Sequence, residues 1–138
     1  MITRQYSYLP EAAKTIRLSV FIDEQGFEVE FDDIDNRAVH LVMYDDTVPV
    51  ATCRIFYDNE KRAYMVGRVA VVKEYRSKHL GSLMMIEAEN HIKNIGGKTI
   101  AVSAQCRVSD FYKKLGFSEE GEMYYDEFCP HILMKKEL

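Results

Sequence analysis

A basic turn between a Val-rich segment and a long apolar-periodic segment is the part of this sequence that could hold an anion. Residues 67–72 read as a strand, and a helix pattern follows directly. The first N–H groups of a helix lack partners within the helix and carry partial positive charge, so an anion placed there is stabilised. Cations are otherwise unfavourable at this end of a helix, which indicates a phosphate or pyrophosphate site, with a solvated charged turn as the alternative. The residues of this candidate site are Arg76, Ser77, Lys78, His79, Leu80, Gly81 and Ser82.

The histidines and cysteines could bind a metal or act as nucleophiles, but their spacing does not favour either. The four histidines and three cysteines form neither an HExxH sequence nor a CxxC pair, so we predict no catalytic metal. Cys53, Cys106 and Cys129 are an odd number and are widely spaced, which indicates reduced thiols rather than a disulfide framework. Reduced thiols fit a cytoplasmic protein.

The composition indicates one globular domain. A chain of 138 residues, 47% of them apolar, can build a single core, which we place over residues 1–138. The net charge of −4 argues against nucleic acid as the main partner, because neutralising phosphates needs a basic surface. No apolar run reaches the ~18 residues that span a bilayer, so we expect no membrane partner.

The elements that must position these residues alternate between strand and helix patterns. Apolar spacing predicts helices over 10–22, 76–95 and 109–115, with an acidic loop over 24–36. Strands are predicted over 1–8, 38–44, 49–57, 64–72, 99–103, 122–125 and 132–136. The order strand, helix, strand, helix in the centre predicts an α/β fold with at least one parallel strand pair. The flanking hairpins make the sheet mixed.

Two motifs resemble the GNAT superfamily of N-acetyltransferases. A strand followed by Arg/Gln-x-x-Gly-x-Gly/Ala at a helix start resembles its acetyl-CoA motif, and here it stands as Arg76-x-x-His79-x-Gly81. His79 replaces the usual middle glycine. The segment 110–117, DFYKKLGF, resembles the (F/Y)Y-x-x-x-GF segment and follows in the same order. Residues 17–25 and 33–40 resemble a small bacterial branch, and residues 111–134 resemble the glyphosate-type enzymes.

The resemblance implies a fold and a reaction. The fold is a mixed, mostly antiparallel sheet with a central parallel strand pair, flanked by about four helices. The reaction is direct transfer of an acetyl group from acetyl-CoA to the amine of a small molecule. The backbone of Val69, Ala70 and Val71 would meet the thioester and the pantetheine, much as a peptide adds to a sheet edge. A CoA-binding module without catalysis and a peptide acetyltransferase, acting on N-terminal amines or lysines, remain as alternatives.

Tyr112 and His131 are the predicted catalytic residues. A phenol with pKa near 10 stays protonated at neutral pH and can donate to a departing thiolate, and the resemblance places Tyr112 as the general acid. His131 stands where the glyphosate-type relatives carry a functional histidine. An imidazole of ordinary pKa is mostly neutral at pH 7 and can accept the proton of the amine. Glu24, Asp33 and Asp35 are alternative bases.

The acceptor pocket is the least determined part of the prediction. Its candidate residues are Arg17, Glu24, Gln25, His40, Arg68 and Gln105. Arg17 could equally form a salt bridge, and His40 could be a buried structural histidine. Ile22 and Gly67 stand where the glyphosate-type enzymes carry arginine, so glyphosate-like anions are disfavoured. Exposed strand edges near the C-terminus are compatible with a homodimer.

Overall fold

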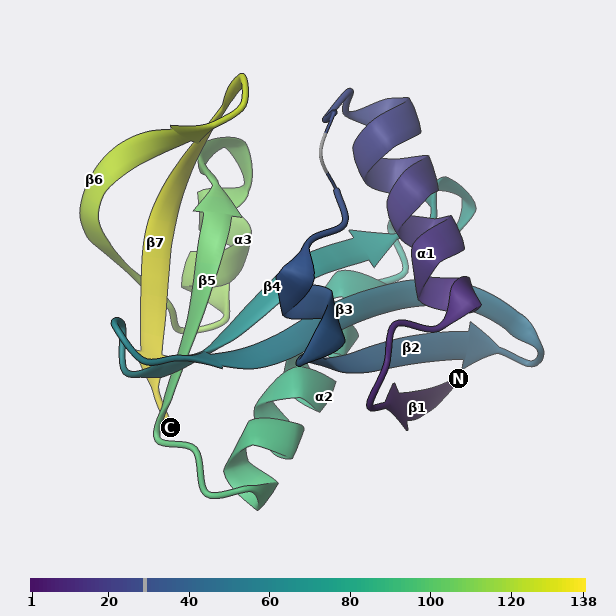
Figure 1. Cartoon of the computed structure of the whole chain (residues 1–138), viewed down its shortest axis with the longest axis horizontal. Coiled ribbons are helices and arrows are strands. Elements are labelled where there is room, and N and C mark those ends of the chain that lie inside the picture. The colour runs from purple at the N-terminus through teal and green to yellow at the C-terminus, as the bar shows by residue number, and fades with distance from the viewer. Residues whose placement is uncertain (29) are drawn as a thin grey trace.

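The centre of the molecule is a seven-stranded sheet (Figure 1). The structure is a computed structural model that describes residues 1–28 and 30–138. The strand order is β1-β2-β3-β4-β5-β7-β6, and every neighbouring pair is antiparallel except β4 and β5. The strands are β1 (Ile2–Tyr6), β2 (Val39–Asp45), β3 (Val48–Asp58), β4 (Ala63–Val71), β5 (Thr99–Gln105), β6 (Ser118–Asp126) and β7 (Cys129–Glu137). The predicted mixed sheet with one central parallel pair is therefore confirmed.

Three α-helices and four other helical segments accompany the sheet in the described ranges. The α-helices are α1 (Glu11–Arg17), α2 (Leu80–Asn94) and α3 (Ser109–Lys114). The other segments are the π-helix η1 (Leu18–Glu24) and the 3-10 helices η2 (Asp33–Asn36), η3 (Lys73–Tyr75) and η4 (Cys106–Val108). None of these helices is long and apolar enough to cross a membrane.

Two helices differ from their predicted limits. The segment 76–95 is helical only from Leu80 to Asn94. Ser77 (φ 71°) and His79 (φ 62°) adopt left-handed backbone conformations, which cannot continue a right-handed helix. The helix predicted over 10–22 is α-helical only to Arg17 and continues as the π-helix η1. π-helical turns are frequent at functional sites.

α1 and α2 cover opposite faces of the sheet. Side chains alternate between the two faces along a strand. On β2, Leu41 and Met43 pack in the cluster that contains α2, whereas Val42 between them packs with α1. The buried apolar side chains of α2 are Leu80, Met84, Met85, Ala88 and Ile92. Burying a large apolar side chain stabilises the fold by about 1.5–3 kcal/mol, so both helices are held firmly against the strands.

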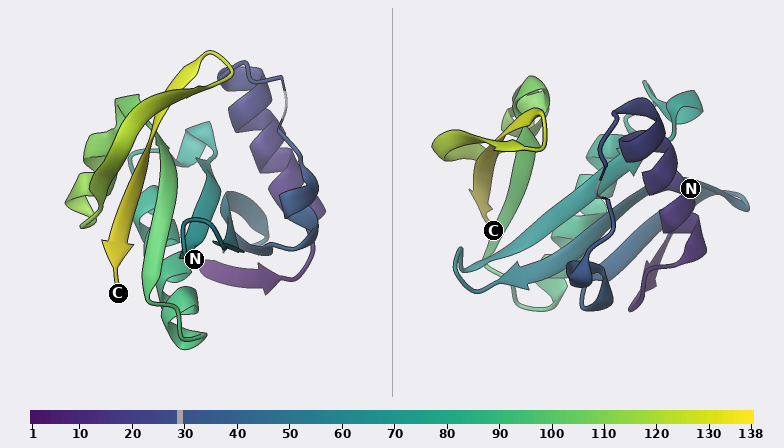
Figure 2. Two further views of the ribbon diagram at one scale, coloured as in Figure 1. Left: turned by 60° about the vertical axis from the view of Figure 1, so that its left-hand side comes forward. Right: turned by 45° about the horizontal axis from the view of Figure 1, so that its top comes forward.

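β4 and β5 pair at one end only and then diverge (Figures 1 and 2). Their parallel register contains two pairs, Tyr64–Ile100 and Met65–Ala101. Gly97 lies at this closed end, where an added Cβ would be 2.9 Å from Tyr64 Cδ2. Beyond Met65, the edge of β4 that faces β5 pairs with no strand of the described chain. A free backbone edge therefore runs through the middle of the sheet.

A β-bulge bends β4 along this free edge. One residue of β3, Cys53, opposes two residues of β4, Arg68 and Val69. Arg68 has φ 51°, the left-handed conformation that glycine usually adopts at the first position of such a bulge. Holding a non-glycine residue there costs on the order of 1–3 kcal/mol. Contacts elsewhere must therefore stabilise Arg68 in this conformation.

Candidate active site

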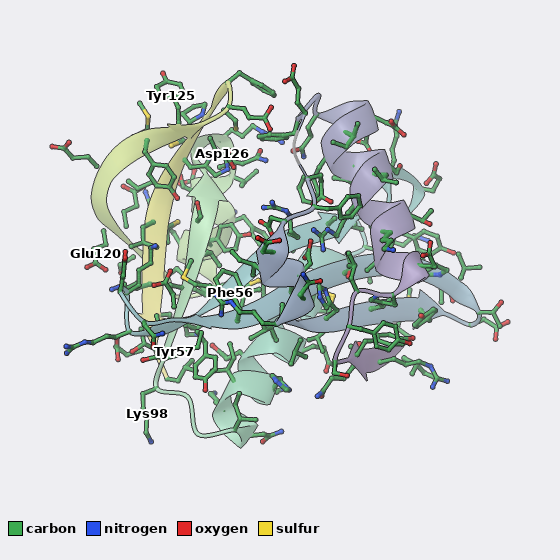
Figure 3. The ribbon with its side chains drawn as sticks, viewed as in Figure 1. Phe56, Tyr57, Lys98, Glu120, Tyr125 and Asp126 are labelled. Atoms are coloured by element: carbon green, nitrogen blue, oxygen red, sulfur yellow. The ribbon has the colours of Figure 1, made fainter. Side chains whose placement is uncertain are left out.

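A cavity of about 200 Å³ lies at the open end of the divergence between β4 and β5. Figure 3 shows Asp126 near this open end, and Phe56 and Tyr57 near the closed end. The residues that line the cavity are Phe21, Gln25, Phe27, Glu30, Val66, Gly67, Arg68, Val69, Ser103, Gln105, Arg107, Val108, Tyr112, Asp126 and His131. The structure thus brings both predicted catalytic residues and four of the predicted acceptor or cofactor residues, Gln25, Arg68, Val69 and Gln105, into one cavity.

Tyr112 projects from α3 into the cavity with only 8% of its surface exposed. Burial, together with the nearby Cys53 thiol, raises its pKa to about 12. Its hydroxyl forms no hydrogen bond within the described part of the chain. Tyr112 is therefore a protonated phenol at neutral pH that is free to donate to a ligand in the cavity.

His131 lies on β7 with 6% of its surface exposed. Its Nδ1 is 2.9 Å from the carbonyl oxygen of Cys129. A carbonyl oxygen can only accept, so Nδ1 carries the proton and a neutral ring has its lone pair on Nε2. The Tyr124 ring stacks on the imidazole at 6.0 Å and Phe27 meets it edge-on at 6.5 Å. These contacts hold the ring in an orientation that leaves Nε2 available as a proton acceptor.

A second hollow, a groove of about 520 Å³, lies at the turn before α2. Val71 of β4 and Phe111 of α3 belong to this groove, whereas Val69 and Tyr112 belong to the cavity. The two spaces are therefore neighbours along the same strand and the same helix. The remaining groove residues are Tyr75, Arg76, Ser77, His79, Leu80, Gly81, Ser82, Lys114 and Leu115.

The backbone of the turn is suited to an anion. No backbone carbonyl of the described chain accepts a hydrogen bond from the N–H groups of residues 77–82. Left-handed residues alternate with others here, and such alternation turns successive N–H groups toward one concave point, which is a common phosphate site. Unpaired N–H groups at a helix start fit the pyrophosphate of coenzyme A. Lys78 lies 4.8 Å above the Tyr75 ring and is not part of the groove lining.

His79, at the position of the motif's middle glycine, has a backbone conformation that favours glycine. Its φ of 62° and ψ of 24° lie in the left-handed region, and its side chain is exposed. Histidine is one of the residues that enter this region more readily than most. Replacement of glycine by His79 therefore preserves the turn and directs the side chain to solvent.

Arg76 and Glu24 form a bidentate ion pair that joins the turn to η1. The distances are 2.7 Å and 2.9 Å, and Arg76 Nε also donates to the carbonyl oxygen of Val71 at 3.1 Å. The hydrogen bonds from Arg76 lower the pKa of Glu24. Glu24 is thus a carboxylate committed to Arg76 and lies outside the cavity, which does not support it as an acceptor-site residue or as the base.

Gln25, Gln105 and Arg107 form a hydrogen-bonded chain along the cavity. Gln105 Nε2 donates to Gln25 Oε1 at 2.9 Å, and Arg107 Nε donates to Gln105 Oε1 at 2.8 Å. The terminal nitrogens of Arg107 have no partner among the described residues. These hydrogen bonds hold the Arg107 guanidinium at the cavity and leave its terminal nitrogens free to donate.

Arg17 and His40 lie away from the cavity, contrary to their expected place in the acceptor pocket. Arg17 is 1% exposed and binds Asp35 through both terminal nitrogens, at 2.9 Å and 3.0 Å, and Glu30 through Nε. His40 is 1% exposed, with Nε2 3.0 Å from the carbonyl oxygen of Asp35. Asp35 is likewise buried by these contacts and cannot act as the base. Arg17 therefore forms a salt bridge and His40 is a buried structural histidine, which are the alternatives noted from the sequence.

Several cavity residues were not predicted from the sequence. Phe21 lies on η1 and Phe27 on the irregular segment after it, and apolar spacing does not distinguish a side chain that lines a cavity from one in the core. Asp126 comes from the β6–β7 hairpin, which long-range pairing brings to the cavity. Arg107 lies on η4, two residues after the end of β5, and ligands bind outside the carboxyl ends of strands in open α/β sheets. That rule could have identified Arg107.

Comparison with known proteins identifies the family. Residues 6–138 match the acetyltransferase (GNAT) domain family, so the chain belongs to the GNAT acetyltransferases. The uncharacterized N-acetyltransferase YjcF of Bacillus subtilis strain 168 is 32% identical over 126 residues, which is 88% of either chain. Protein ElaA of Escherichia coli K12 is 27% identical over 128 residues, covering 89% of this chain and 84% of ElaA.

Solved structures share the fold. The crystal structure of Escherichia coli ElaA matches with a TM-score of 0.86 and 24% identity, covering 99% of both chains. An aminoglycoside 6′-N-acetyltransferase complexed with coenzyme A matches with a TM-score of 0.76 and 13% identity, covering 99% of this chain and 97% of that one. The divergence of β4 and β5 therefore occurs within a fold that the aminoglycoside 6′-N-acetyltransferase also has.

Proposed function

We propose that the protein transfers the acetyl group of acetyl-CoA directly to the amine of a small molecule. The observation that carries the proposal is the place of Tyr112, which lines the cavity directly beside the groove and whose hydroxyl has no hydrogen-bond partner among the described residues. The cavity of about 200 Å³ is smaller than the ~300–1,000 Å³ of sites for drug-sized ligands, which favours a compact acceptor over a peptide.

Acetyl-CoA would lie along the groove and reach the cavity between β4 and β5. The unpaired N–H groups of residues 77–82 would hold the pyrophosphate, and Arg76 could exchange Glu24 for it. The free edge of β4 at Val69 to Val71 would hydrogen bond to the pantetheine and the thioester oxygen. Coenzyme A in the related aminoglycoside 6′-N-acetyltransferase supports this choice of donor.

The residues of the cavity would divide the proton transfers between them. His131 Nε2 would accept a proton from the acceptor amine while the amine nitrogen forms a bond to the carbonyl carbon of the thioester. The bond from that carbon to sulfur breaks, and Tyr112 would donate its proton to the departing thiolate. Exchange with water returns both side chains to their starting states, so one proton passes in net from the amine to the thiol.

The test is thiol release from acetyl-CoA with a panel of small amines. We expect Tyr112→Phe to lower kcat by roughly 10²-fold, in line with the loss of a general acid. Tyr57→Phe, at the closed end of the sheet, is the matched control and should retain wild-type kcat. Equal rates for wild type and Tyr112→Phe would show that Tyr112 is not the acid.

A separate measurement tests binding of the donor. Saturating acetyl-CoA should raise the melting temperature, since a ligand at 100 times Kd stabilises a protein by about 2.7 kcal/mol. Absence of any shift would overturn the acetyl-CoA assignment. A shift without thiol release from any amine would instead favour a CoA-binding module.

A further inference from the structure

Six charged side chains form one hydrogen-bonded cluster behind the cavity wall. Three are arginines, one each from α1, β3 and β4, and three are acids from the single segment 30–35. The members of this cluster, which we call the Arg–acid cluster, are Arg17, Glu30, Asp32, Asp35, Arg54 and Arg68. Its formal charges cancel, so it can remain ionised although most of it is buried.

Glu30 links the buried side of the cluster to β4, where Asp32 also contacts Arg68, with Oδ2 3.4 Å from Nη2. The Glu30 carboxylate accepts from Arg17 Nε at 2.9 Å and 3.0 Å and lies 2.8 Å from Arg68 Nε. Its carbonyl oxygen accepts from Arg68 Nε at 3.1 Å and from Arg17 at 3.2 Å. With 2% of its side chain exposed, Glu30 is fixed from α1 on one side and holds Arg68 on the other.

Arg68 needs such a contact because of its backbone. It occupies the left-handed position of the β4 bulge, which favours glycine. The bulge lies in the part of β4 that does not pair with β5, so no strand pairing fixes its shape on that side in the described chain. Gly67, Arg68 and Val69 also line the cavity. The path of this backbone therefore decides where the free edge of β4 points.

We propose that Glu30 and Arg68 are positioning residues, which hold the β4 bulge and thereby aim the backbone of Val69 to Val71 at the thioester. This inference rests on the acetyl transfer proposed above. Neither side chain takes part in the proton transfers. Arg17 holds Glu30 from the buried side, and Asp32 gives Arg68 a second, longer contact.

Two substitutions of Arg68 separate positioning from direct contact with substrate. Arg68→Ala and Arg68→Gly both remove the guanidinium, but only glycine adopts a φ of 51° without strain. We expect kcat of Arg68→Ala to be at least about tenfold lower than kcat of Arg68→Gly, since losing one oxyanion donor costs about 10²–10³-fold. The Kd for coenzyme A, measured by calorimetry, should change less than about threefold in both, because its phosphates bind elsewhere.

Arg62 supplies a matched control. It has the same φ of 51°, is exposed and lies in the turn before β4, outside the cavity lining and the Arg–acid cluster. Arg62→Ala and Arg62→Gly should have equal kcat values. Equal kcat values for the two Arg68 variants would overturn the proposal: both low would mean that the guanidinium contacts substrate, and both near wild type that the bulge needs no ion pair.

Glu30→Gln and backbone NMR complete the test. Glu30→Gln should lower kcat in wild type but not in the Arg68→Gly background, where no guanidinium remains to be held. Amide signals of Val69 to Val71 should shift in Arg68→Ala and stay near their wild-type positions in Arg68→Gly. This readout needs no turnover, so it decides the inference even if acetyl transfer is not observed. Unshifted signals in Arg68→Ala would refute it.

Discussion

The surroundings of Tyr112 and His131 suit the opposite proton roles that we propose for them. Tyr112 is buried with no hydrogen-bond partner among the described residues, and burial keeps its proton in place. His131 is fixed by the carbonyl oxygen of Cys129, which places the proton on Nδ1 and leaves Nε2 without one. Each proposed role rests on one local feature, so single substitutions can test them separately.

The pKa of Tyr112 predicts the alkaline side of the pH profile. A phenol whose pKa is raised to about 12 stays almost fully protonated up to about pH 10. We therefore expect kcat to show no decline between pH 8 and about 10, whereas an ordinary phenol of pKa near 10 would be half ionised at about pH 10. The measurement is kcat for wild type and Tyr112→Phe across this range. A decline with a midpoint below pH 10 that Tyr112→Phe abolishes would contradict the burial argument.

At the scale of elements, the turn before α2 and the segment 30–35 both adopt arrangements that their local sequence disfavours. Two non-glycine residues adopt left-handed conformations in the turn. In the segment 30–35, three acids share three arginines from other elements. Each arrangement predicts a different response to substitution.

The conformation of His79 predicts how the turn tolerates change. His79→Gly should bind acetyl-CoA within about twofold of wild type, because glycine adopts a φ of 62° freely. His79→Val should weaken binding at least about tenfold, because a β-branched residue is a genuine outlier in this region. Calorimetric titration with acetyl-CoA measures both. Equal weakening by glycine and valine would instead assign the binding to the imidazole.

Asp35 predicts a loss of stability in acid. Burial alone would raise its pKa, but hydrogen bonds from Arg17 and Arg54 outweigh burial and lower it to about 2. The folded state then binds fewer protons than the unfolded state, so this stabilisation is present above about pH 4 and is lost as the pH falls toward 2. One pKa unit corresponds to 1.36 kcal/mol, which makes the contribution about 2 kcal/mol.

Urea unfolding of wild type and Asp35→Asn at pH 6 and pH 3 measures this contribution. The difference in unfolding free energy between the two proteins should shrink by about 1 kcal/mol or more at pH 3. The comparison isolates Asp35 from Glu30, whose pKa burial raises and whose contribution has the opposite sign. Asp33→Asn, at an exposed carboxyl of the same η2 helix, should show no such change. A constant difference for Asp35→Asn would disprove the linkage.

The sequence predicted the helices and strands better than it predicted which side chains are in contact. The order of strands and helices followed from periodicity, and the candidate site at 76–82 from motif resemblance, since both signals are local in the chain. The burial of Arg17 did not, because its partners lie 13 and 18 residues away on an irregular segment. The predicted limits of α2 were wrong for a related reason: Ser77 and His79 adopt left-handed conformations although neither is glycine.

At the scale of the whole molecule, the sheet consists of two parts joined by the two-pair contact of β4 with β5. β1 to β4 form one part, and β5, β7 and β6 form the other (Figure 2). A ligand that fills the space between them would contact both. Binding should therefore restrain the inner strands more than the outer ones.

Hydrogen exchange measures this restraint. With saturating acetyl-CoA we expect slower exchange in residues 66–71 of β4, in the turn 77–82 and in α3. β1 and β6, at the two outer edges, should exchange as before. Uniform slowing across all strands would indicate global stabilisation in place of a ligand held between β4 and β5.

The short contact between β4 and β5 also bears on how the chain folds. Tight turns join β2, β3 and β4, whereas η3, α2 and their connections separate β4 from β5. Closing a longer loop costs more entropy, and contacts between distant residues form more slowly. We expect the β2–β4 meander and the β6–β7 hairpin to form first and the parallel pair to join them last. The space between β4 and β5 does not exist until that step, so the chain acquires its ligand site only as folding ends.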